Sequence, residues 1–291
     1  MNKKHILVLI DFKNEPEVGL KSAINIASQV DAEINLLNVI DEPNPSGVEP
    51  SADIVYKKRK ENVHDLFTIE LIKKRKQQIS NLIETHNFGE IKVDSSIKLG
   101  DFESMLEEYL EDHPTDLIVM TTTGESSLSE WYSGNHAAQA MRIADIPVLA
   151  VKDYHPFTYE SNLLLLVDIK NYKKELVGTI RNFANLMAMK VHILHIKQDK
   201  DLVIDDTKAW MKSFAEDNHF ENYDISIVDS DDMIAKIKSL ADDQSVDVVA
   251  SISKTDTGLA RLLFGSDTEK VLKEVDDPVL VINDPVPIVN D

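Results

Sequence analysis

The sequence predicts an α/β protein of two similar halves, each a five-stranded parallel sheet with helices on both faces. Residues 5–14 form an apolar run followed by aspartate, another apolar residue and Lys-Asn, and this order returns at 162–171. A second pattern, aspartate, any residue, proline and four apolar residues, occurs at 145–151 and again at 276–282. Between these landmarks short apolar runs alternate with segments of helical period, which is typical of βαβ units.

The elements follow the same order in both halves, with strands at the apolar runs and helices at the segments of helical period. In the first half we expect strands at 5–10, 34–39, 91–97, 116–121 and 147–151, and helices near 16–30, 58–87, 102–112 and 135–144. In the second half we expect strands near 162–167, 191–196, 223–228, 246–251 and 279–282, and helices near 172–188, 205–217, 231–243 and 267–275. Continuous runs such as 163–167 indicate strands covered on both faces.

The two halves differ in length. Asp11 and Asp168 are 157 residues apart but Pro147 and Pro278 only 131, so the second half is 26 residues shorter between these landmarks. A loop at 41–50 with three prolines, together with the long helix after it, accounts for most of the difference. We place the boundary around 152–161 and expect one domain at 1–153 and a second at 154–291.

Composition excludes several classes of function. The 291 residues are 43% hydrophobic and 28% charged, as in an ordinary globular protein. Asp and Glu outnumber Lys and Arg 51 to 31, and a net charge of −20 repels polyanions, so we expect neither nucleic acid nor an anionic membrane as a partner. The chain has no cysteine, which excludes disulfides, thiolate nucleophiles and cysteine-based metal sites.

The start of the chain does not resemble a targeting segment. Its apolar run at 6–10 is interrupted by Asp11 too early for a signal peptide, and no apolar run approaches the ~20 residues of a membrane helix. A cytoplasmic location is therefore the expectation.

A ligand would bind beyond the carboxyl ends of the strands, where loops and helix amino termini converge. In the first half Asp11 follows the first strand and Val39 ends the second. After the fourth strand the loop contains Gly124 and Gly134, separated by nine residues, and a helix begins directly afterwards. Glycine lets the backbone approach a ligand closely, and the free amides of a first helical turn bind anions such as phosphate.

These features resemble the universal stress protein family, as two tandem domains of flavodoxin-like or Rossmann-like fold covering practically the whole chain. Nucleotide-binding members carry Gly-x-x-Gly, nine residues, and Gly-Ser or Gly-Thr between the fourth strand and the last helix, with aspartate ending the first strand. The resemblance implies an adenine nucleotide, ATP or AMP, with or without Mg²⁺. The residues that it implies for the first site are Asp11, Val39, Thr121, Thr123, Gly124, Gly134, Asn135 and His136.

Both halves depart from the full motif. In the first half Thr121 stands in place of the first glycine and Asn135 in place of serine or threonine. In the second half Ile252 and Thr255 replace both glycines of the pair. The remaining matches make a weaker second site from Asp168, Gly265 and Ser266. A β-carbon at a glycine position hinders close approach of the backbone to phosphate.

The same residue types also serve purely structural roles. Gly134 and Gly265 suit a tight strand-to-helix connection, and an aspartate at a strand end often caps loop amides. His192 and His195 are separated by three positions on a predicted strand, so they point to opposite faces and packing accounts for them better than metal binding.

No catalytic motif is present, so we expect a protein that is not an enzyme. The function that the resemblance implies is adenine-nucleotide binding in the first domain, coupled to stress adaptation. The alternative is a structural or interaction protein that has lost nucleotide binding in both domains and acts through protein partners. Residues 148–151 and 279–282 are apolar enough to pair edge to edge, which would make one chain a pseudo-dimer. A further homodimer stays open.

Overall fold

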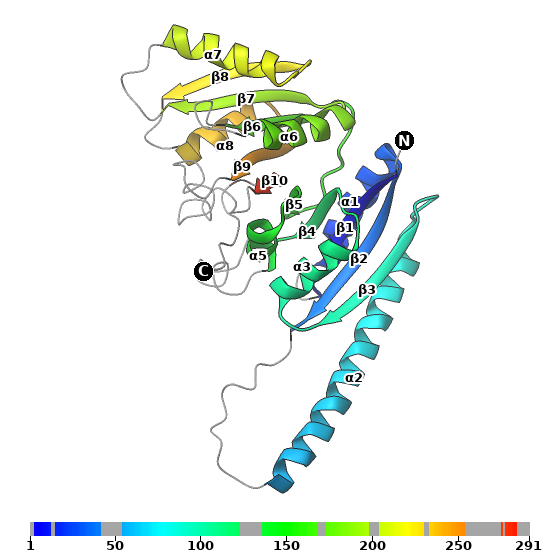
Figure 1. The fold of residues 1–291 in the computed structure, drawn as a ribbon. Coiled ribbons are helices and arrows are strands. Elements are labelled where there is room, and N and C mark those ends of the chain that lie inside the picture. The colour runs from blue at the N-terminus through cyan, green and yellow to red at the C-terminus, as the bar shows by residue number, and fades with distance from the viewer. Residues whose placement is uncertain are drawn as a thin grey trace.

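The computed structural model confirms an α/β fold with one large, mostly parallel sheet between helices (Figure 1). It describes residues 3–12, 15–41, 54–122, 136–167, 173–197, 204–229, 233–253, 275 and 277–283. We call the part up to β5 the first half and the part from β6 the second half. No helix among the described residues is both long and apolar enough to cross a membrane.

The described elements agree with the predicted ones to within four residues at every end. The first half comprises β1 (Lys4–Leu9), α1 (Pro16–Val30), β2 (Ala32–Ile40), α2 (Ile54–Thr85), β3 (Val93–Leu99), α3 (Phe102–Asp112), β4 (Leu117–Thr121), α5 (His136–Ile143) and β5 (Val148–Val151). The second half comprises β6 (Asn162–Leu166), α6 (Lys174–Leu186), β7 (Lys190–Lys197), α7 (Ile204–Asp217), β8 (Tyr223–Asp229), α8 (Met233–Asp243), β9 (Val248–Ser253) and β10 (Val279–Asn283). The predicted helix at 267–275 lies largely outside the described residues.

The strand order is β3-β2-β1-β4-β5-β10-β9-β6-β7-β8 in a single ten-stranded sheet. Strands within each half pair in parallel, whereas β5 and β10 pair antiparallel, with Leu149 opposite Leu280. The expected edge-to-edge pairing of these two strands is thus confirmed. Because the junction is antiparallel, the carboxyl ends of the parallel strands point to opposite edges of the sheet in the two halves.

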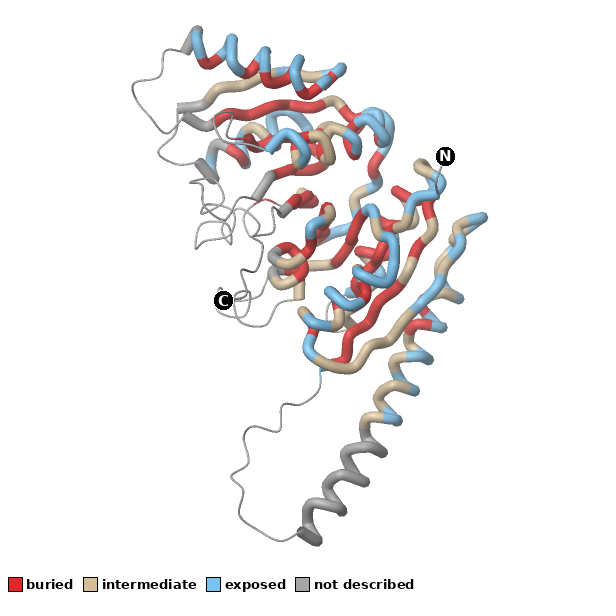
Figure 2. Tube along the Cα trace, in the orientation of Figure 1, coloured by how far each residue is buried: buried red, intermediate tan, exposed pale blue. Residues whose placement is uncertain are grey.

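The core lies on both faces of the sheet because side chains alternate along each strand. Ile6, Val8 and Ile10 belong to a cluster that contains residues of α1 and α6, whereas Leu7 and Leu9 belong to another cluster with α3 and α5. The first cluster includes residues of both halves, so the two share one continuous apolar layer. Figure 2 shows the buried strands between helices whose outer faces are exposed.

A left-handed backbone residue occurs at the same place in both halves, 157 residues apart like the sequence repeat. The residue after α1, Asp31, has a φ of 50°, and Ala188, 157 positions later, has the same φ. In each case a left-handed residue turns the chain from the first helix of the half into its second strand.

Candidate ligand-binding site

The carboxyl ends of β1, β2 and β4 surround a small hollow, which we call the carboxyl-end recess. The first residues of α3 and α5 close its open side. It is lined by Leu9, Ile10, Asp11, Leu37, Val39, Phe102, Met120, Thr121 and His136. The recess therefore brings together four residues predicted from sequence, Asp11, Val39, Thr121 and His136.

The free volume of the recess is about 20 Å³. This is enough for about one water molecule, which needs ~10–15 Å³ of such volume, whereas small-molecule sites usually offer ~300–1,000 Å³. The recess as described therefore has no room for a ligand of nucleotide size.

A stacked pair of rings lines the recess. The rings of Phe102 and His136 lie parallel, with centroids 4.1 Å apart and planes within 5° of each other. The Nε2 atom of His136 lies 3.3 Å from an oxygen of Asp41, the residue that follows β2. The stack thus joins α3 to α5, and Asp41 connects it to the end of β2.

Phe102 is held in place by the start of α3. Asp101 is the N-cap of this helix, and its carboxylate accepts a hydrogen bond of 3.0 Å from the amide of Ser104. That backbone hydrogen bond is the largest cause of the lowered pKa of Asp101, and the Ser104 hydroxyl adds to it. Since the capped form is the carboxylate, the first turn of α3 is well defined at neutral pH.

A buried side-chain amide is hydrogen-bonded to the end of the strand that precedes Asp11. Asn38 on β2 is 4% exposed, and its side-chain amide donates a hydrogen bond of 2.7 Å to the carbonyl of Ile10. The second half repeats this contact with another residue type, because Nδ1 of His195 lies 3.4 Å from the carbonyl of Val167. Asn38 and His195 are 157 positions apart, and so are Ile10 and Val167.

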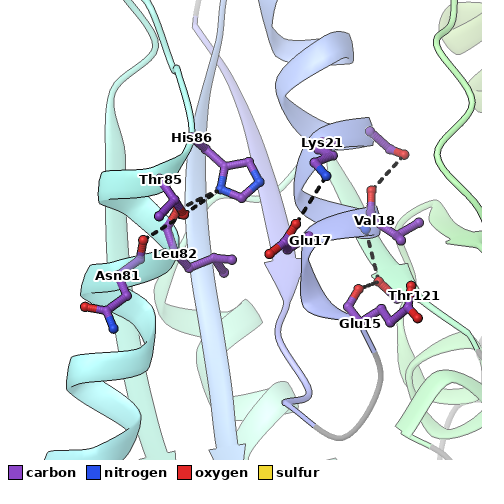
Figure 3. A network of polar contacts seen from close by, with 11 residues as sticks. Glu15, Glu17, Val18, Lys21, Asn81, Leu82, Thr85, His86 and Thr121 are labelled. Carbon is purple, nitrogen blue, oxygen red and sulfur yellow. Dashed lines mark hydrogen bonds and ion pairs between the residues drawn. The ribbon is translucent and has the colours of Figure 1, made fainter.

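Thr121 directs its hydroxyl toward the first turn of α1 (Figure 3). The hydroxyl accepts a hydrogen bond of 3.0 Å from the amide of Gly19 and donates one of 3.2 Å to the carbonyl of Glu15. A β-carbon at position 19 would lie 3.0 Å from this hydroxyl oxygen, so tight a contact that the threonine would have to shift to make room. Thr121, which stands in place of a motif glycine, therefore fits here because the residue opposite it on α1 is Gly19.

The remaining predicted site residues lie outside the described residues. They are Thr123, Gly124, Gly134 and Asn135 in the first half and Asp168, Gly265 and Ser266 in the second. In the described part of the chain, no group of three or more His, Asp or Glu side chains is placed to hold a metal ion. His192 and His195 are both 5% exposed, in agreement with the packing role expected for them.

Sequence reasoning missed Asn38 and Phe102. Asn38 is a polar residue inside an apolar run, which is a usable signal because a buried amide needs a partner. Phe102 carries no comparable local signal, since its importance comes from its contact with His136.

Comparison with known proteins identifies the family of this chain. Residues 2–152 match the Universal stress protein family. The universal stress protein MJ0531 of Methanocaldococcus jannaschii is 30% identical over 151 residues, which are 51% of this chain and 82% of that protein. The crystal structure of a universal stress protein from Archaeoglobus fulgidus covers 97% of this chain and 96% of its own, at 15% identity and a TM-score of 0.65, and shares the fold.

Another structure of an Archaeoglobus fulgidus universal stress protein was solved in complex with dAMP; it covers 43% of this chain at 15% identity and a TM-score of 0.32. That complex is a property of that protein, and the family assignment does not depend on it. The assignment follows from the match over residues 2–152, more than half of the sequence, and from the relative at 30% identity. This chain belongs to the universal stress protein family.

Proposed function

We propose that the first half binds an adenine nucleotide, ATP or AMP, at the carboxyl-end recess and acts by binding rather than by catalysis. The observation that carries the proposal is the convergence of Asp11, Val39, Thr121 and His136 on one recess at the strand ends. This is where open parallel sheets bind ligands. In this arrangement Val39 offers backbone and apolar contacts to the base, and Asp11 contacts the ribose and phosphate region, directly or through Mg²⁺.

Binding requires the stack of Phe102 and His136 to open, because the recess holds only about 20 Å³. When the rings separate, their faces become available to an adenine ring, which is itself a good stacking partner. His136 is also the first residue of α5, so its displacement changes the start of that helix. A ligand that prefers the open form would thus alter a surface that a partner protein can read.

The first experiment is thermal unfolding of the purified protein with ATP or AMP, each with and without Mg²⁺, together with mass spectrometry of copurifying nucleotide. A ligand at 100 times its Kd stabilises the native state by ~2.7 kcal/mol, which for a chain of this size raises Tm by about 5–10 °C. A saturating rise for an adenine nucleotide supports the proposal. If no nucleotide shifts Tm and none copurifies, the proposal is wrong.

Gly134→Val tests the site itself. A branched side chain at this position hinders close approach of the backbone to phosphate, so the nucleotide-dependent rise in Tm should disappear. Gly178→Val on α6 is the matched control, because a β-carbon there meets nothing closer than an Arg181 nitrogen at 3.8 Å. An equal loss of the ligand effect in both variants would show that Gly134 has no specific part in binding.

A second candidate is a scaffold for protein partners without nucleotide binding. The observation that favours it is the antiparallel pairing of β5 and β10, which builds within one chain the two-fold arrangement of a dimer. This candidate expects no nucleotide effect on Tm, and it expects Gly134→Val to leave capture of partner proteins by the immobilised chain unchanged. Loss of capture in that variant would contradict it.

A further inference from the structure

An apolar cavity of about 400 Å³ lies between the two halves, at the amino ends of β1 and β4. We call it the interhalf cavity. It is lined by Lys4, Ile6, Ile26, Val30, Asp116, Leu117 and Pro147 of the first half and by Thr179, Asn182, Phe183 and Leu186 on α6. Leu186 is 43% exposed at its margin. The cavity is separate from the carboxyl-end recess, which lies at the other ends of the same strands.

The internal repeat gives this cavity a counterpart in the same molecule. Positions on the first strand and helix of each half are related by 157 residues, and positions on the last two strands by 131. Asn182 and Leu186 on α6 therefore correspond to Asn25 and Gln29 on α1. The counterpart of the interhalf cavity is the space next to these two α1 residues.

That counterpart is filled by the segment connecting the halves. Phe157 is 1% exposed and belongs to the core cluster of α1 and α6. Its amide donates a hydrogen bond of 2.8 Å to the side-chain oxygen of Asn25, and its carbonyl accepts one of 2.9 Å from the side-chain amide of Gln29. The connecting segment is thus fixed by one buried ring and by two hydrogen bonds with α1 side chains, one donated to Asn25 and one accepted from Gln29.

The interhalf cavity and its counterpart each have an aspartate at one end that accepts a hydrogen bond from the first strand of a half. Asp116 accepts hydrogen bonds from the amide of His5 at 2.9 Å and from Lys4 at 2.7 Å. Its counterpart, Asp247, accepts one from the amide of Asn162 at 2.7 Å and contacts His155 at 2.6 Å. The two spaces therefore differ mainly at the centre, where Phe157 fills one and no described side chain fills the other.

The sequence contains a segment that matches the connecting segment in position and pattern. Residues 153–157 read Asp-Tyr-His-Pro-Phe, and residues 284–288, 131 positions later, read Asp-Pro-Val-Pro-Ile. Aspartate, proline and a large apolar residue recur at matching places. Ile288 is the counterpart of Phe157.

The end of β10 lies beside the cavity. Val281 pairs with Val148, whose neighbour Pro147 lines the cavity, and β10 ends two residues later at Asn283. Five further residues reach up to ~16 Å in extended form. Ile288 is therefore within reach of a cavity that begins next to the strand.

We propose that residues 284–291 dock in the interhalf cavity, with Ile288 in the place that Phe157 takes in the counterpart. The side-chain oxygen of Asn182, which accepts hydrogen bonds of 2.9 and 3.3 Å from Arg181 in this structure, turns to the Ile288 amide, as the oxygen of Asn25 accepts from the Phe157 amide. Leu186 stands where Gln29 stands, so the second hydrogen bond is replaced by apolar contact, which covers an exposed leucine. The connecting segment and residues 284–291 then fasten the two halves on equivalent sides.

Disulfide trapping tests this directly, because the chain has no cysteine of its own. The full chain with Asn182→Cys and Ile288→Cys is oxidised, and the intrachain bond is measured by mass spectrometry of the digested protein. Asn182 is exposed, so its substitution does not endanger folding. The pair Glu111→Cys and Ile288→Cys, with position 111 exposed on α3, is the negative control, and Asn25→Cys with Pro156→Cys is the positive control.

Docking predicts that the 182–288 bond forms at least about tenfold faster than the 111–288 bond, since a docked segment holds the thiols at high effective concentration. Thermal unfolding is a second measurement. Ile288→Asp should lower Tm by about 2–8 °C, because burying a carboxylate in an apolar site is unfavourable. Ile288→Leu is the control and should leave Tm nearly unchanged. Neither measurement uses nucleotide, so failure here is distinct from failure of the proposed function.

Three results would overturn the proposal. Equal rates for the 182–288 and 111–288 pairs, with no effect of Ile288→Asp on Tm, would show that the segment does not dock. Cross-linking at 182–288 only between two chains would assign the cavity to a second copy. A copurifying apolar small molecule, bound equally by wild type and Ile288→Asp, would assign it to that ligand.

Discussion

His192 on β7 is a buried histidine whose protonation opposes folding. It is 5% exposed, with its ring nitrogens 3.4 Å from the Asn162 side-chain oxygen and 3.7 Å from Asp224. Burial lowers its pKa, Lys190 lowers it further, and Asp224 acts in the opposite direction. The folded protein therefore prefers the neutral ring.

This shift predicts a dependence of stability on pH. The unfolded chain binds a proton at His192 near its ordinary pKa of about 6.5, whereas the folded chain binds it only at lower pH. The free energy of unfolding should thus decrease as pH falls below about 6.5 toward the folded pKa. Urea unfolding at a series of pH values between 7 and 5 should show a flatter profile for His192→Gln than for wild type. His86→Gln is the control, and an unchanged slope in His192→Gln would contradict the assignment.

Thr121 shows how one residue can change a site without disturbing the fold. In the family motif this position is glycine, and here its hydroxyl makes two hydrogen bonds to the start of α1. The contact couples the end of β4 to the helix that follows Asp11. The threonine therefore has a structural role of its own.

Among the elements, α3 depends most clearly on a single cap. Asp101→Ala removes the carboxylate that accepts the Ser104 amide, and loss of an N-cap typically costs about 1 kcal/mol. The same change loosens Phe102 and hence the stack with His136. Urea unfolding measures the first effect. Glu107→Ala, at an exposed position of the same helix, should change the free energy of unfolding by less than about 0.5 kcal/mol.

If Asp101→Ala and Glu107→Ala are equally stable, the cap does not contribute to the stability of the helix. A nucleotide titration of Asp101→Ala then separates the two roles of the cap. A change in nucleotide affinity without a change in stability would show that Asp101 acts only by placing Phe102.

The elements themselves were largely predictable from sequence. The predicted helices at 16–30 and 102–112 coincide with α1 and α3, because local signals define their ends, proline at the start of α1 and an aspartate cap before α3. The start of α2 differs most, at 54 rather than 58, since the proline-rich sequence before it contains no clear cap signal. Hydrophobic periodicity and the residues that begin or end a helix are local features, so a single sequence shows them.

The contacts of the candidate site were less predictable. Asp11, Val39, Thr121 and His136 could be placed at the strand ends from their positions in the repeat and motif. The partner of Thr121 is 102 residues away on α1, and Phe102 meets His136 through two separate helices. Such pairings depend on tertiary distances, which neither periodicity nor motif spacing encodes.

For the whole molecule, the junction of β5 and β10 decides whether the halves behave as one unit. Leu280 and Leu149 face each other there, both fully buried, in the apolar layer shared by the halves. Leu280→Ala should cost about 2–5 kcal/mol, as for other leucines truncated in a core. Ile69→Ala on α2, where the side chain is 48% exposed, is the control with a small expected effect.

Calorimetry of Leu280→Ala reports on cooperativity as well as stability. A single transition shifted to lower temperature would show that the halves unfold together. Two separate transitions would show that the junction holds together halves that are stable on their own. An unshifted single transition would contradict the central place of Leu280 in the shared layer.

Joining the two halves covalently also frees them to diverge. In a dimer of identical chains every substitution occurs twice, so a change that suits one site is imposed on the other. Here Gly19 and Thr121 form a matched pair in the first half, while Leu176 and Ile252 occupy the equivalent positions in the second. Asn38 and His195 likewise hold equivalent strand ends with different chemistry. With both halves in one chain, equivalent positions can thus differ in chemistry while the backbone contacts around them stay alike.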